Sequence, residues 1–97
     1  MKEEHAGLLV RAKVDSRAAE ATARTKFPNA REVSAEIEEE NGKLIYTFEF
    51  KTKGKTGIDE VNVDALTGEV VRVEHESPAA EAREKAADSK KRAVRPR

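Results

Sequence analysis

The large apolar residues of this chain are confined to its first three quarters. They recur from Leu8 to Val73, whereas the last 21 residues contain only one, Val94. A core forms where apolar side chains can be buried together, so only the part of the chain before Ser77 can build one. The chain therefore divides into a lead-in segment or short strand at residues 1–13, a folding unit at 14–76 and a C-terminal tail at 77–97.

Charge changes sign between the folding unit and the tail. Lys+Arg and Asp+Glu both number 19, and this neutral total excludes a uniformly basic nucleic-acid binder. Residues 1–76 nevertheless carry 12 basic and 16 acidic side chains, whereas the tail carries seven basic and three acidic side chains. The basic clusters at residues 90–92 and 95–97 lack interleaved aromatic residues for stacking on bases. We interpret the tail as a solubilising segment or as one that binds an acidic surface, and we expect no nucleic-acid partner.

The first regular element that the pattern predicts is a helix over residues 16–26. Asp15 is a suitable N-cap, and the run that follows is rich in helix formers. Ala19, Ala23 and Phe27 recur every four residues and form one apolar stripe. The proline after Phe27 disfavours helical geometry at that residue and ends the helix. Because two residues of the stripe are alanines, the helix can approach a sheet closely.

Alternation of apolar and polar residues predicts strands from there to residue 76. Val33, Ala35 and Ile37 are expected to face inward in the first strand. Asn41 and Gly42 then supply the positive backbone angles of a two-residue hairpin turn. The next strand, at 43–52, directs a set of large residues to one face: Leu44, Tyr46, Phe48 and Phe50.

Two further strands complete the predicted sheet. Val61 and Val63 alternate with polar residues, and residues 69–76 return beside them. Between them we expect a turn, with Asp64 bonding to nearby backbone and Gly68 in the left-handed conformation. The predicted fold class is α+β, with one helix packed on an antiparallel meander whose other face is mostly solvated. The Ala-rich basic tail is expected to be a marginal helix or disordered, and residues 8–13 a short strand or an extended lead-in.

The order of these motifs resembles that of the PepSY domain family. The resemblance rests on the helix stripe, Pro28 and Asn29, the Asn41 turn, the aromatic strand and the run Val-Asn-Val-Asp-Ala-Leu-Thr-Gly-Glu-Val at residues 61–70. It covers about residues 14–73. Asn29 stands where the family usually has glycine, and asparagine is the best substitute in the left-handed conformation expected there.

The resemblance implies a domain without catalytic residues or cofactors. PepSY domains occur in the propeptides of thermolysin-type metallopeptidases, as inhibitors or folding aids, and as stand-alone exported or membrane-linked proteins. The resemblance therefore implies that this chain has a periplasmic or extracellular location. The longest apolar run near the start, at residues 8–10, is too short for a signal peptide or a membrane span. On this basis we expect the chain to be a mature or truncated form.

The residues themselves offer little for catalysis or metal binding. His5 and His75 are the only histidines, and no metal-ligand spacing connects them. Glu39 and Glu40 stand at a turn, and Glu36 and Glu38 lie on the outer side of a strand, where a solvated face is the simplest interpretation. We therefore expect no enzyme activity and no metal or other cofactor.

Binding to another protein remains the mechanism that the chain can support. Exposed strand edges can accept an extended peptide, and acidic side chains can bias the choice of partner. The binding residues we predict lie on the outer face of the sheet: Glu36, Glu38, Ile45, Thr47 and Glu49. Ile45 is included as an exposed apolar contact on that face. The predicted partner is a protein such as a metallopeptidase, and the alternative is a structural or assembly domain that self-associates; the chain is then a monomer or a weak homodimer.

Overall fold

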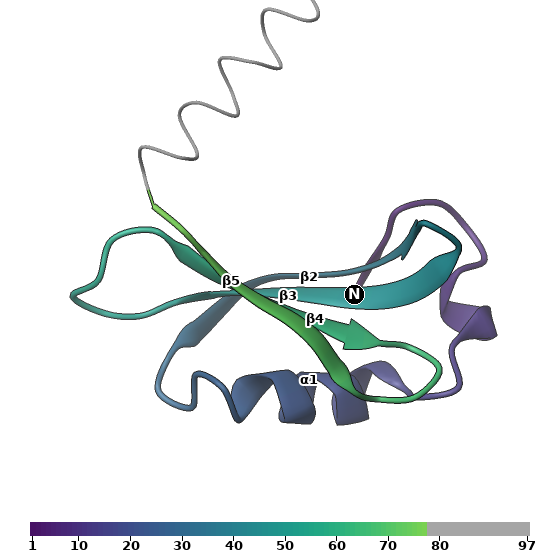
Figure 1. The fold of residues 1–97 in the computed structure, drawn as a ribbon, viewed down its shortest axis with the longest axis horizontal. Coiled ribbons are helices and arrows are strands. Elements are labelled where there is room, and N and C mark those ends of the chain that lie inside the picture. The colour runs from purple at the N-terminus through teal and green to yellow at the C-terminus, as the bar shows by residue number, and fades with distance from the viewer. Residues whose placement is uncertain (78–97) are drawn as a thin grey trace, which may run out of the picture.

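The computed structural model describes residues 1–77, in which one helix lies along one side of a twisted sheet (Figure 1). The expectation of a helical or disordered tail concerns residues outside this part. The elements are β1 (Lys2–Glu3), a 3-10 helix (Leu9–Arg11), α1 (Ser16–Arg24), β2 (Arg31–Glu40), β3 (Lys43–Lys51), β4 (Ile58–Asp64) and β5 (Val70–Glu76). This arrangement confirms the predicted α+β class.

The sheet has five strands in the order β1-β2-β3-β4-β5. Strands β2 to β5 form the expected antiparallel meander, but β1 pairs parallel to β2, with Lys2 opposite Glu36. The prediction for residues 8–13 was wrong, because this segment contains the 3-10 helix and the additional strand lies earlier. The Glu3 carboxylate accepts a hydrogen bond from the backbone N–H of Leu9 at 2.8 Å and so ties the lead-in to the strand.

Helix α1 begins at the predicted cap. The Asp15 carboxylate accepts a hydrogen bond from the backbone N–H of Ala18 at 2.8 Å, and Ala19 and Ala23 are fully buried. Alanine has no side chain beyond Cβ, so the helix lies close to β3 and β4, its principal contacts in the sheet. The expectation for Asn29 was wrong: among the described non-glycine residues only Asn41 has a positive φ, of 52°, as the first residue of the predicted hairpin turn.

The core lies between α1 and the face of the sheet that carries Ile37, Tyr46 and Val63, here called the inner face. Its largest buried side chains include Leu8, Ile37, Tyr46, Phe48, Phe50, Val61 and Val63. The Tyr46 hydroxyl donates a hydrogen bond to the carbonyl oxygen of Val14 at 2.7 Å, and this bond joins the aromatic strand to the start of the helix. The predicted aromatic stripe is therefore the core.

Val33 departs from the predicted alternation. A β-bulge between Glu32 and Ser34 leaves Val33 without a partner on β3, and its side chain is 42% exposed. Glu32 pairs with Phe50 instead, so its side chain lies on the inner face. Because a bulge adds one residue to a strand, the residues on one side of it point to the opposite face from the one that strict alternation predicts. The sequence pattern alone does not show where such a bulge lies.

The close packing of α1 can be tested by enlarging one alanine. Because Ala23 is fully buried, Ala23→Leu should overpack the interface and lower the free energy of unfolding by about 1–3 kcal/mol. Ala21→Leu, on the exposed side of the same helix, should change it by less than about 0.5 kcal/mol. Urea denaturation of the two variants measures the difference, and equal stabilities would contradict the predicted helix orientation.

Candidate protein-interaction face

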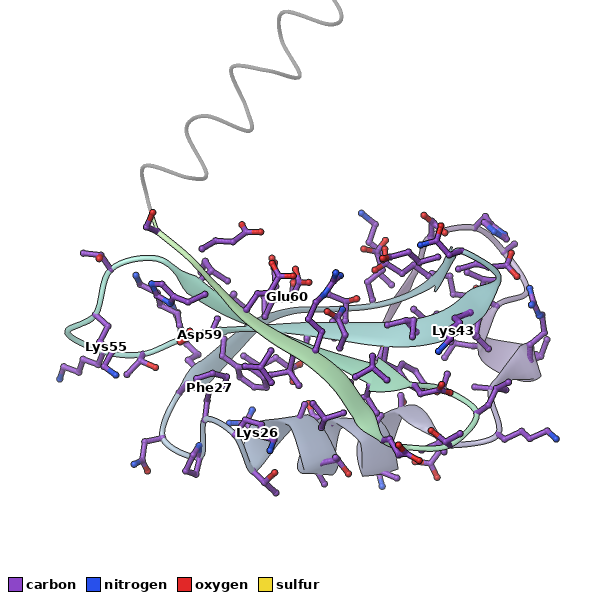
Figure 2. The ribbon with its side chains drawn as sticks, in the orientation of Figure 1. Lys26, Phe27, Lys43, Lys55, Asp59 and Glu60 are labelled. Carbon is purple, nitrogen blue, oxygen red and sulfur yellow. The ribbon has the colours of Figure 1, made fainter. Side chains whose placement is uncertain are left out.

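The face of the sheet opposite α1 is defined by the register of β2 to β5 and is here called the outer face. One row across it contains Glu36, Thr47, Asn62 and Arg72, and a neighbouring row contains Ser34, Glu49, Glu60 and Glu74. Figure 2 shows Glu60 on the side away from α1, whereas the preceding residue, Asp59, lies on the side of Phe27. The outer face is therefore predominantly polar, as predicted.

A chain of hydrogen bonds fixes the side chains at the centre of this face. The Thr47 hydroxyl donates to the Glu38 carboxylate at 2.8 Å and accepts from the Asn62 amide at 2.8 Å. The Asn62 side-chain oxygen accepts from Arg72 Nε at 3.1 Å. Arg72 also forms ion pairs with Glu74 at 2.9 Å and Glu40 at 3.7 Å. Four strands thus share one polar network, which holds these groups in place before any partner arrives.

Three carboxylates stand in register beside this network. Glu49 pairs with Glu60, and Glu60 pairs with Glu74, although like charges directly opposite one another are unfavourable. Desolvation by burial raises the pKa of Glu60, and the charges of Glu49, Glu76 and Glu74 raise it further. The Ser34 hydroxyl donates to Glu49 at 2.7 Å and relieves one end of the row. The row therefore favours a cation beside it.

Ile45 was expected to be an exposed contact, and this expectation was wrong. Its side chain is only 5% exposed, because β3 is a central strand with Glu38 and Asp64 opposite it on the two sides. It lies in a hollow of about 250 Å³ on the outer face. The hollow is lined by Glu40, Asn41, Lys43, Ile45, Asn62, Val71 and Arg72.

The other predicted binding residues lie together on the outer face. Glu36 and Thr47 are cross-strand partners, and Glu38 and Glu49 flank them. The sequence analysis did not identify Asn62, Arg72 or Glu60 as members of the same surface. Their strands were predicted, but the pairing register between β4 and β5 includes a bulge after Asn62 that no sequence signal placed.

His75 makes a structural contact at the end of β5, whereas His5 is exposed near the N-terminus. His75 Nδ1 lies 2.7 Å from a carboxylate oxygen of Asp59, and Asp59 is only 9% exposed. Gly57 lies against the same strand end: a Cβ there would stand 2.2 Å from the carbonyl oxygen of Glu76. Over residues 1–77 no three His, Asp or Glu side chains are grouped to hold a metal ion, and no helix is long and apolar enough to cross a membrane.

A second unusual carboxyl lies on the inner face, between β2 and α1. Burial and the neighbouring Glu20 carboxyl together raise the pKa of Glu32 from 4.5 to about 7, although Arg24, 4.0 Å away, and the N-terminal amino group act to lower it. One Glu32 oxygen is buried and has no donor among the described residues. A proton held between the Glu20 and Glu32 carboxyls would supply that donor. The hydrogen-bonding groups between helix and sheet are therefore best paired when Glu32 is protonated.

Comparison with known proteins yields one finding. The family model for PepSY, described as peptidase propeptide and YPEB domain, matches residues 13–74. No curated protein and no solved structure matches the chain significantly.

The raised pKa of Glu32 predicts a pH-dependent stability. Stabilisation from a protonated Glu32 is fully present below its ordinary pKa of 4.5 and is lost as pH rises through about 7, so the melting temperature should fall between about pH 5 and pH 8. Glu32→Gln should remove most of this fall, and Glu60→Gln a smaller part. Glu69→Gln, at an exposed turn position, serves as the control. Calorimetry over this range measures the effect, and an unchanged pH profile in Glu32→Gln would contradict it.

Proposed function

Because this chain belongs to the PepSY domain family, whose members are typically non-catalytic modules, we propose that it binds a protein partner and inhibits or regulates it. The proposed partner is a peptidase, with a metallopeptidase as the first candidate. PepSY domains usually occur in exported proteins, and we place this activity outside the cytoplasm, in the periplasm or the extracellular space.

The pre-organised outer face is the observation that carries the proposal. Helix α1 covers the inner face, so the outer face is the broad surface of the sheet that remains for a partner. The network from Glu38 through Thr47 and Asn62 to Arg72 fixes side chains across it, so little side-chain freedom is lost on binding.

Inhibition follows from steric occupation, without any chemical step on this chain. A rigid face that enters a peptidase cleft excludes substrate from it. Glu36, Glu38 and Glu49 favour a cleft with basic groups at its rim, since complementary charge increases the association rate and the specificity. The Thr47 hydroxyl holds the Glu38 carboxylate in place. Ile45 contributes through the hollow that it lines with Val71, where a partner's apolar side chain fits.

Affinity capture from an envelope extract of the source organism tests the proposal. The immobilised chain should retain a metallopeptidase and inhibit its proteolytic activity in a dose-dependent manner. Glu36→Lys should weaken both effects by at least about tenfold, since it reverses a charge on the outer face beside Thr47. Glu69→Lys makes the same change of charge at an exposed position in the connection between β4 and β5, outside both strands, and should leave both effects intact.

Two results would contradict the proposal. Equal loss of capture in Glu36→Lys and Glu69→Lys would show that net charge, and not the outer face, governs binding. A peptidase that is retained on the column but remains fully active would show that the contact does not regulate it.

A further inference from the structure

Strand β5 is an open edge of the sheet in the part of the chain that the structure describes. The strand order ends with β5, so alternate backbone N–H and C=O groups along it point away from β4. The opposite edge is better protected. There β1 pairs with β2, Glu4 N–H donates to the Ile37 carbonyl oxygen at 2.9 Å, and the Glu4 carboxylate accepts from Glu39 N–H at 3.1 Å. Long unprotected edges favour pairing with another strand.

The side chains of β5 make this edge apolar on one side and charged on the other. Val73 pairs with fully buried Val61 on the inner face but is itself 45% exposed, so the apolar surface of the inner face continues to the edge. Arg72 and Glu74 flank it on the outer face. When two copies of this cation-valine-anion sequence run antiparallel, each cation lies opposite an anion and the two valines lie opposite each other.

We propose that β5 pairs antiparallel with β5 of a second copy, with Val73 on the two-fold axis. In this register Val73 faces Val73, Arg72 of each copy faces Glu74 of the other, and both charge pairs lie on the outer face. A shift of one residue sets inner side chains against outer ones. If the register shifts by two residues, either two Arg72 side chains or two Glu74 side chains face each other on the axis, where like charges repel.

The same pairing completes the row of carboxylates on the outer face. Glu49, Glu60 and Glu74 stand in register within one copy, and the next position across the edge is then the Arg72 of the second copy. A cation therefore follows three adjacent anions. The bulge at Val71 limits regular pairing to the short stretch around Val73, so the dimer is weak and depends on concentration.

This inference goes beyond the proposed function and stands independently of it. Pairing at β5 leaves Glu36, Glu38 and Glu49, which lie on β2 and β3, uncovered for a partner. A dimer would therefore present two copies of the outer face in one continuous sheet.

Sedimentation over the micromolar to millimolar range tests the pairing with the full chain. The wild type should dimerise, and Arg72→Glu and Glu74→Arg should each weaken association by at least about tenfold, since each replaces both attractive pairs with repulsive ones. An equimolar mixture of the two variants should associate again, because each then meets the opposite charge. Circular dichroism confirms that both variants are folded. A wild type that stays monomeric throughout, or a mixture that does not associate, would overturn the proposal.

Cross-linking locates the axis. The chain has no cysteine, and directly opposite residues in an antiparallel pair have Cβ atoms about 4.5–5.5 Å apart, near the span of a disulfide. Val73→Cys should therefore form a disulfide dimer on mild oxidation much faster than Val33→Cys, whose side chain is exposed to a similar degree on β2. Equal rates would overturn the register. A wild type that captures a peptidase but stays monomeric up to millimolar concentration would overturn the pairing while supporting the proposed function.

Discussion

The alternation of side chains along β3 is the constraint on which the rest of the structure depends. Its inward positions hold Tyr46, Phe48 and Phe50, and few other side chains in the described residues are large enough to build a core. The helix must therefore cover that face, and the alanines of α1 let it do so closely. The outward positions of the same strand are then left on the opposite face, so the core and the candidate binding face arise from one strand.

Sequence patterns predicted the features that local chemistry determines. The cap at Asp15, the hairpin at Asn41 and the turn at Asp64, whose carboxylate accepts from the backbone N–H groups of Leu66 and Thr67, each depend on a side chain and its immediate neighbours. The alternation in β3 likewise needs only period two, and it correctly placed the aromatic residues in the core.

The features that the sequence did not reveal depend on contacts between distant segments. The bulges at Val33 and Val71 are set by pairing across strands, and β1 exists because residues 2–3 meet the edge of β2 more than 30 residues later. Ile45 was assigned to the correct face, but its burial depends on neighbours contributed by two other strands. Four of the five predicted binding residues therefore lie as expected on the outer face. Asn62 and Arg72 belong to the same surface, but only the strand register shows that they do.

The two edges of the sheet differ in a way that bears on association. At β2 the short strand β1 and the Glu4 side chain occupy backbone groups that would otherwise attract another strand, and this protection requires a lead-in segment outside the main meander. At β5 no described segment provides an equivalent cover, and the exposed valines Val71 and Val73 lie there beside charged neighbours. Because the charges on β5 are arranged with opposite signs on either side of Val73, the edge is selective in the strands it can accept. The chain thus protects one edge by covering it and restricts the other by its sequence of charges.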